Sequence, residues 1–246
     1  MISKNIKFKN FSNIKIPLKK KLKKIFRSLI TENNQLLISL SNKYLDNFDK
    51  KKISKYKNYK IMQIFGMGGS GLGTKAIYNF LKNKINKKVI FFDNLRFNKI
   101  DKSKKKLNLV ISKSGNTLET IVNSNIYINK TDRNIFITED KLNYLKKFAQ
   151  ELKAEVIHHN NFIGGRYSVL SEVGMLPAEL MGLKSSHFRQ FNTLVKNKSF
   201  MNALLQNVNS TLFFLKNKKL NSIILNYDDY SHDLFYWYQQ LIAESL

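Results

Sequence analysis

Short apolar runs alternate with segments of helical spacing along much of the chain, and this alternation restricts the possible folds more than any other feature. The apolar runs lie at residues 61–65, 89–92, 107–111, 135–138 and 155–158. The helical segments between them include residues 74–81, 118–126 and 141–152. Strand–helix units of this length are typical of a parallel sheet covered by helices on both faces. We therefore predict an α/β fold whose ligand site lies beyond the carboxyl ends of the strands.

The third apolar run leads into a turn that is rich in hydroxyl groups, the hydroxyl turn (residues 112–117). Its candidate ligand-binding residues are Ser112, Lys113, Ser114 and Thr117. Gly115 permits a sharp bend, and helical spacing resumes at Leu118. Unpaired N–H groups at a helix N-terminus, together with hydroxyls and an ammonium, can replace the water around a phosphate. We predict an anion-binding turn, and an ordinary capped helix start with Glu119 nearby is the alternative.

A second turn, the glycine turn (residues 66–73), follows the first apolar run. The G-x-G-x-x-G spacing of dinucleotide-binding loops is met by Gly66, Gly68 and Gly71. Asp93 follows about 20 residues later, where such proteins hold a ribose hydroxyl. The extra Gly69, with Ser70 at the expected helix start, suits a single phosphate or a sugar hydroxyl instead. A nucleotide-dependent dehydrogenase therefore stays open as an alternative to a sugar-phosphate site.

Two glycines precede an arginine in a third turn, the arginine turn (residues 161–168, Asn-Phe-Ile-Gly-Gly-Arg-Tyr-Ser). Gly164 and Gly165 allow the backbone to approach a ligand closely. The Arg166 guanidinium adds a permanent cation with several donors. The turn is predicted to contact a ligand, and a structural arginine in a tight turn is the alternative.

The composition favours a basic cytoplasmic protein without a membrane partner. Its 246 residues are 43% hydrophobic, yet no apolar run approaches the roughly 20 residues that span a bilayer, and residues 1–15 lack the apolar core of a signal peptide. The formal charge is +26, but the lysines are scattered and no zinc-finger or RNA-binding aromatic motif accompanies them. We therefore expect a solvated basic surface and no nucleic-acid partner. The absence of cysteine excludes disulfides and thiolate zinc sites.

Helices are also expected on both sides of the alternating region. Before it, one apolar stripe recurs at helical intervals under a lysine-rich face, formed by Leu18, Leu22, Ile25, Phe26, Leu29 and Ile30. This stripe predicts a packing helix, with a helix on a membrane surface as the alternative. After it, we expect a helix over residues 200–215, a strand over residues 221–225 and a helix from residue 233 onward. No capping residue ends that last helix, so the chain is expected to be a fragment of a longer protein.

The three turns, in their order and spacing from about residue 60 onward, resemble the signatures of the glucose-6-phosphate isomerase family. The matching segments are residues 66–73, residues 112–120 (Ser-Lys-Ser-Gly-Asn-Thr-Leu-Glu-Thr) and residues 164–168. Residues 237–246, Trp-Tyr-Gln-Gln-Leu-Ile-Ala-Glu-Ser-Leu, resemble that family's active-site helix. The resemblance implies a flavodoxin-like sugar-isomerase (SIS) domain, a parallel-sheet sandwich, followed by the start of a second, truncated SIS domain. The expected boundaries are a basic helical extension over residues 1–59, the first SIS domain over residues 60–190 and the incomplete second over residues 191–246.

The resemblance also implies an activity, the interconversion of glucose 6-phosphate and fructose 6-phosphate in glycolysis and gluconeogenesis, without a metal or cofactor. Glu244 would move the proton between carbons 2 and 1 through an enediol, and Arg166 would stabilise the enediolate. The substrate and its phosphate would be bound by Gly69, Ser70, Ser112, Lys113, Ser114, Thr117, Gly165 and Gln240. The chemistry agrees, because proton abstraction beside a carbonyl requires a base and a cation near the developing oxyanion.

The chain also departs from the family. The family's ring-opening histidine and a catalytic lysine lie in its C-terminal part, which this chain lacks, and the partner subunit donates that histidine. The resemblance therefore implies a homodimer for the full-length protein and little activity for these 246 residues alone. Asn116 stands where the family commonly has threonine. A non-catalytic sugar-phosphate regulator and an isomerase that also accepts mannose 6-phosphate stay open as alternatives.

Overall fold

The computed structural model describes residues 16–17, 20–32, 34–96, 105–219 and 221–245, and these residues form two compact units. The larger unit combines Leu45–Ser185 with Asn226–Leu246, and the smaller combines Met1–Tyr44 with Ser186–Leu225. Every residue of the predicted site falls within the larger unit. The expected boundaries at residues 59/60 and 190/191, and the second SIS domain, stay predictions.

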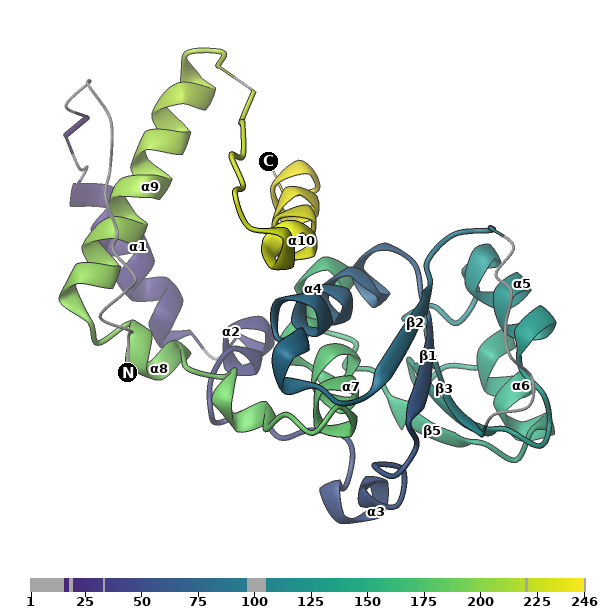
Figure 1. Cartoon of the computed structure of the whole chain (residues 1–246). Helices are drawn as coiled ribbons and strands as arrows, with labels where there is room; N and C mark the ends of the chain where they lie inside the picture. The colour runs from purple at the N-terminus through teal and green to yellow at the C-terminus, as the bar shows by residue number, and fades with distance from the viewer. Residues whose placement is uncertain (1–15, 18–19, 33, 97–104, 220, 246) are drawn as a thin grey trace. The chain divides into compact units, whose positions relative to one another are not determined.

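A five-stranded sheet forms the centre of the larger unit (Figure 1). Its strands are β1 (Ile61–Phe65), β2 (Lys88–Phe92), β3 (Lys106–Ile111), β4 (Arg133–Thr138) and β5 (Glu155–His158). All neighbours are parallel, in the order β2-β1-β3-β4-β5, which confirms the predicted α/β fold. This is the flavodoxin-like order, in which the winding reverses between β1 and β3 and ligands bind beyond the strand ends there. The glycine turn follows β1 and the hydroxyl turn follows β3, so both lie at the reversal.

Helices cover both faces of this sheet (Figure 1). In the larger unit they are α3 (Lys50–Ser54), α4 (Leu72–Phe80), α5 (Leu118–Tyr127), α6 (Tyr144–Glu151), α7 (Glu172–Leu180) and α10 (His232–Ala243). α4 and α7 lie on one face and α5 and α6 on the other, while α10 packs against α4. α6 begins at Tyr144 rather than at residue 141, because the Asn143 side chain caps it by accepting from the Lys146 N–H over 2.9 Å.

An aromatic core joins the sheet to α5 and α6. The rings of Phe65 and Phe92 stack with their centroids 4.4 Å apart. The buried members of this core are Phe65, Phe92, Val110, Ile128, Phe136, Leu145 and Ala149. All six residues of β3 are buried, as expected of a central parallel strand with both faces covered. The core therefore fixes the strand ends from which the site turns emerge.

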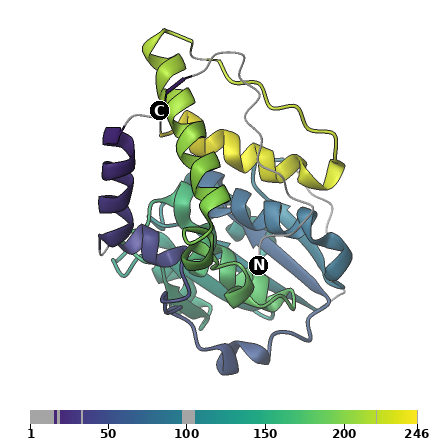
Figure 2. The same ribbon diagram turned by 90° about the vertical axis from the view of Figure 1, so that its left-hand side faces the viewer.

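The smaller unit consists of α1 (Lys20–Thr31), α2 (Gln35–Ser39), α8 (Phe191–Leu194) and α9 (Lys198–Lys216). α1 contacts α9, and its apolar stripe is only partly covered, with Ile25 52% exposed. Figure 2 shows the two helices, α1 in purple and α9 in light green. Leu18 of the predicted stripe lies outside the described residues. In the described part of the chain, no helix is both long and apolar enough to cross a membrane.

The strand predicted over residues 221–225 is wrong. These residues have no regular secondary structure, and Ile223 and Leu225 are exposed. A strand requires a neighbour that accepts and donates backbone hydrogen bonds, and no described strand lies beside this segment. Local β propensity alone was not sufficient to form a strand here.

Lys87 is a buried lysine just before β2. Its ammonium donates to the backbone carbonyls of Lys57 and Tyr59, which holds the segment that enters β1. Burial, followed by the charge of Lys60, lowers the pKa of Lys87 to about 8. Above this pKa and below the ordinary lysine value, the unfolded chain binds more protons than the folded protein, so stability rises with pH across this window.

We compare the free energy of unfolding of the wild type with that of Lys87→Met. The difference, wild type minus variant, is expected to increase by at most about 3 kcal/mol between about pH 7 and about pH 10. Urea titrations at both pH values measure this difference. The matched control is Lys88→Met, which removes an exposed neighbouring charge. If the difference in unfolding free energy between the wild type and Lys87→Met did not change with pH, this would contradict a buried ammonium in the folded protein.

Candidate active site

The glycine turn and the arginine turn pack against each other backbone to backbone. The glycine turn forms a short 3-10 turn between β1 and α4, with Gly68 at a φ of +49°. A Cβ on Gly69 would lie 2.3 Å from the carbonyl carbon of Gly165 and 2.6 Å from the nitrogen of Arg166. The Ser168 hydroxyl donates to the Gly69 carbonyl oxygen over 3.3 Å. Because no side chain fits at residue 69, its glycine permits the contact between the two turns.

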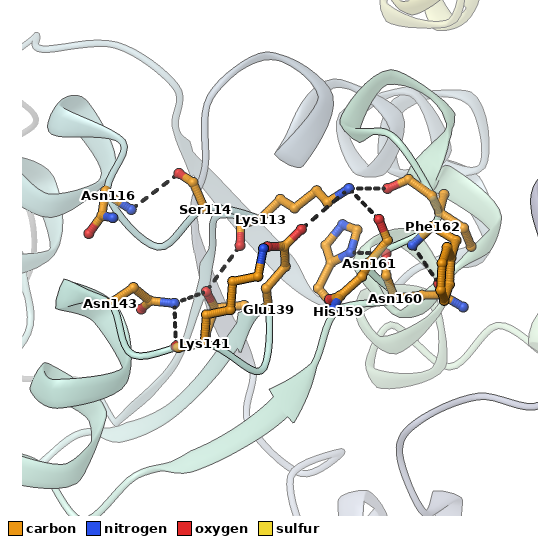
Figure 3. Close-up of polar contacts among 12 residues, drawn as sticks. Lys113, Ser114, Asn116, Glu139, Lys141, Asn143, His159, Asn160, Asn161 and Phe162 are labelled. Atoms are coloured by element: carbon orange, nitrogen blue, oxygen red, sulfur yellow. Dashed lines mark hydrogen bonds and ion pairs between the residues drawn. The ribbon is translucent and has the colours of Figure 1, made fainter.

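The hydroxyl turn lies between the end of β3 and the start of α5. The hydroxyl oxygens of Ser112 and Thr117 are 2.8 Å apart, and the Gly115 N–H donates to Ser112 Oγ over 3.2 Å. Ser114 Oγ accepts from the Asn116 N–H over 3.3 Å (Figure 3). Thr117 is the N-cap residue of α5, yet its side chain makes no capping hydrogen bond. The turn therefore differs from an ordinary capped helix start and leaves the first N–H groups of α5 to another acceptor.

Lys113 connects the hydroxyl turn to the arginine turn. Its Nζ donates to the carbonyl oxygens of Asn161 over 2.8 Å and Ile163 over 3.1 Å (Figure 3). The same atom lies 3.4 Å from Glu139 Oε1, and Glu139 also pairs with the exposed Lys141 over 3.5 Å. The ammonium predicted to contact a phosphate is therefore engaged by two carbonyls and a carboxylate.

Arg166 and Glu244, the two predicted catalytic residues, form an ion pair with Nη1 3.2 Å from Oε2. Gln240, one turn earlier on α10, donates from Nε2 to Glu244 Oε1 over 2.9 Å. Both oxygens of the candidate base are thus held by donors, and the predicted shared helical face of Gln240 and Glu244 brings their side chains into contact. Trp237 Nε1 donates to the Arg166 carbonyl oxygen over 3.1 Å, which links α10 to the arginine turn.

Tyr167 and Ser245 complete this group, although sequence reasoning gave neither a role. Ser245 Oγ accepts from Arg166 Nε over 3.2 Å and lies 2.5 Å from the Tyr167 hydroxyl oxygen. The guanidinium carbon lies 5.0 Å from the centre of the Tyr167 ring. The hydrogen bond with Tyr167, aided by the charge of Glu244, raises the pKa of Arg166 and keeps the guanidinium protonated. Their positions in the sequence could have indicated a role, because Tyr167 directly follows Arg166 and Ser245 directly follows Glu244.

Asp93, the acid that completed the dinucleotide-binding pattern, is engaged elsewhere. Its Oδ2 lies 2.9 Å from the Nζ of Lys75 on α4. The same Nζ lies 4.0 Å from Asp233 on α10. This carboxylate therefore links the end of β2 to α4 instead of presenting a free acceptor to a ribose, which weakens the dehydrogenase interpretation.

The predicted site residues form two sets. One contiguous set comprises Gly69, Gly165, Arg166, Gln240 and Glu244, and the other comprises Ser112, Ser114 and Thr117. Ser70 is half-buried at the end of the 3-10 turn, with its N–H donating to the Met67 carbonyl over 2.9 Å. Within the described residues no direct hydrogen bond or ion pair joins the two sets, and Lys113 connects the turns that carry them.

Comparisons with known proteins find relatives of this chain. The glucose-6-phosphate isomerase of Methanocaldococcus jannaschii is 32% identical over 223 residues, which cover 82% of this chain and 54% of the relative. The glucose-6-phosphate isomerase of Acholeplasma laidlawii is 31% identical over 244 residues, which cover 85% of this chain and 55% of the relative. The chain thus spans about half the length of the curated relatives that it matches.

A solved structure shares the fold. The crystal structure of a hypothetical protein from Thermus thermophilus is similar with a TM-score of 0.70 and 22% identity, over 92% of this chain and 60% of that one. Residues 42–246 match a family model described as phosphoglucose isomerase. That match includes all three turns and α10 with Glu244, so the chain belongs to the phosphoglucose isomerase family.

Proposed function

We propose that the full-length protein interconverts glucose 6-phosphate and fructose 6-phosphate, with Glu244 as the base and Arg166 as the cation beside it. The observation that carries this proposal is the Arg166–Glu244 ion pair at 3.2 Å, held by Gln240 on one side and Ser245 on the other. A carboxylate beside a permanent cation is what proton abstraction next to a carbonyl requires.

In the proposed reaction, one proton moves from carbon 2 to carbon 1 of the open-chain sugar and one moves from oxygen 2 to oxygen 1. The Glu244 carboxylate accepts the carbon-bound proton, which leaves an enediolate, and returns it to the neighbouring carbon. Arg166 stabilises the negative charge that develops on oxygen, because its guanidinium stays protonated throughout. The ion pair with Glu244 opens when substrate enters, and Gln240 continues to orient the carboxylate.

The phosphate of the substrate is proposed to bind at the hydroxyl turn. Ser112, Ser114 and Thr117 supply hydroxyls there, and the first turn of α5 supplies N–H groups that the Thr117 side chain does not cap. Ser70 and the backbone at Gly69 and Gly165 complete the proposed binding surface. This phosphate contact positions the reacting carbons at Glu244 and needs no metal or cofactor in the proposed mechanism.

The hydroxyl turn carries a specific prediction. We expect Ser112→Ala or Thr117→Ala in the full-length protein to raise KM for fructose 6-phosphate about tenfold while kcat stays within a few-fold, because the lost hydroxyl contacts a phosphate that does not react. Steady-state kinetics measure this split. Thr131→Ala, which removes an exposed hydroxyl outside the site, is the matched control. A fall in kcat with KM unchanged would place these hydroxyls at the reacting carbons instead.

A coupled assay tests the proposed function. The full-length protein should form glucose 6-phosphate from fructose 6-phosphate in the presence of a chelator, and the same assay with mannose 6-phosphate decides whether a second sugar is accepted. Sugar-phosphate binding without turnover would favour the regulator, and binding of NAD or NADP would favour the dehydrogenase. We further propose that the full-length protein is a cytoplasmic homodimer. Its ligand is the sugar-phosphate substrate, and it binds neither nucleic acid nor membranes.

A further inference from the structure

We propose that Lys113 is a positioning residue, which fixes the arginine turn relative to the hydroxyl turn, and that its ammonium does not bind the substrate phosphate. The inference concerns the internal construction of the site and rests on the proposed function only for its kinetic consequence. It differs from the direct phosphate contact that the sequence suggested for this side chain.

The ammonium of Lys113 is already engaged by two carbonyl oxygens and a carboxylate in this arrangement. A protonated lysine has three N–H donors. Two of them donate to the carbonyl oxygens of Asn161 at 2.8 Å and Ile163 at 3.1 Å, and the Oε1 of Glu139 lies 3.4 Å from the same nitrogen as its ion-pair partner. To reach a phosphate, the ammonium would have to abandon the carbonyl of the buried Ile163 and the Glu139 carboxylate, whose side chain is only 14% exposed.

The two carbonyls are placed where they control Arg166. Asn161 and Ile163 lie on either side of Phe162, and the segment from Gly164 to Arg166 follows directly. The start of the loop is held separately, because Asn160 Oδ1 accepts from the Phe162 N–H over 3.0 Å (Figure 3). Lys113 therefore ties the backbone at Ile163, and the Ser168 hydroxyl ties it again at the Gly165 carbonyl oxygen over 2.6 Å, directly before the arginine.

The tie is reinforced from β4. The Glu139 N–H donates to the Lys113 carbonyl oxygen over 3.0 Å, and the Thr138 hydroxyl donates to the same oxygen over 3.3 Å. Main chain and side chain of Lys113 are thus both anchored, and the loops that follow β3, β4 and β5 meet at this one residue. Phosphate binding at the hydroxyl turn and charge stabilisation at Arg166 are thereby held in a fixed relative geometry.

Amide hydrogen exchange on the 246-residue chain tests the tie without any substrate. The reporting amides are Ile163, which donates to the Asn160 carbonyl, and Tyr167, which donates to the Gly164 carbonyl. We expect Lys113→Met to speed their exchange at least tenfold, while the Lys75 amide in α4 is unchanged. The matched control is Lys141→Met, which removes the other cation beside Glu139 without touching either carbonyl. Equal exchange in Lys113→Met and wild type would overturn the proposal.

Kinetics of the full-length protein then separate positioning from phosphate binding. We expect Lys113→Met to lower kcat for fructose 6-phosphate about thirtyfold with KM within about threefold, and Lys113→Arg to restore part of the rate. We expect Glu139→Gln to act in the same direction with a smaller effect. A phosphate-binding ammonium predicts the opposite, because loss of its carboxylate partner would free it and lower KM. A lowered KM in Glu139→Gln, or a tenfold higher KM with unchanged kcat in Lys113→Met, would overturn the proposal.

Discussion

Glu244→Gln in the full-length protein is expected to lower kcat for fructose 6-phosphate by about a thousandfold, with KM changed only a few-fold. The carboxylate is the proposed base, and an amide of the same shape cannot accept the proton. The Gln240 contact at Glu244 Oε1 can persist in the variant, because an amide oxygen also accepts from an N–H. A coupled assay with chelator measures kcat, and thermal unfolding checks that the variant is folded.

Glu151→Gln is the matched control, since it makes the same substitution at an exposed residue of α6. It should leave both kcat and thermal stability at the wild-type level. Turnover by Glu244→Gln close to that of the wild type would show that another group moves the proton, and Glu244 would then have no place in the mechanism.

Gly69→Ala is expected to lower kcat about a hundredfold and the free energy of unfolding by about 1–3 kcal/mol. The added methyl group would lie 2.3 Å from the carbonyl carbon of Gly165 and 2.6 Å from the nitrogen of Arg166, so backbone must move on one side. A movement on the side of the arginine turn displaces Arg166 from its position 3.2 Å from Glu244. Kinetics and urea unfolding of the full-length protein measure the two effects.

Gly164→Ala is the control for this substitution. A Cβ on Gly164 would lie 3.6 Å from a ring carbon of Tyr167, which is an ordinary contact. The stability of Gly164→Ala should therefore match that of the wild type. If Gly69→Ala retained wild-type kcat and stability, the close packing of the glycine turn on the arginine turn would have no part in holding Arg166.

Features that depend on neighbours along the chain were predictable from the sequence. The five apolar runs became β1 to β5 with small shifts at their ends, because parallel strands with both faces covered are apolar throughout. Gly115 adopts a φ of +67°, as the predicted sharp bend requires. Gln240 and Glu244 share a helical face because they are four residues apart, and their side chains are in contact.

Features that depend on distant partners were not predictable in this way. The segment over residues 221–225 has the composition of a strand, but a strand forms only where another strand offers its backbone, and none does so in the described residues. Lys113 illustrates the same limit for a side chain. Its position in the hydroxyl turn suggested a phosphate contact, whereas its acceptors lie on loops that come 26 to 50 residues later.

The sequence by itself determined the alternation of strands and helices and the placement of three polar turns at strand ends, because both follow from residue type and short spacing. The candidate base and cation came from the resemblance to a known family. Only the tertiary structure decided which groups act on one another. Arg166 meets Glu244 from 78 residues away, and Lys113 binds Asn161 from 48 residues away. Such pairs form because the parallel sheet brings successive strand ends to one edge, and no local pattern in the chain records which side chains will meet there.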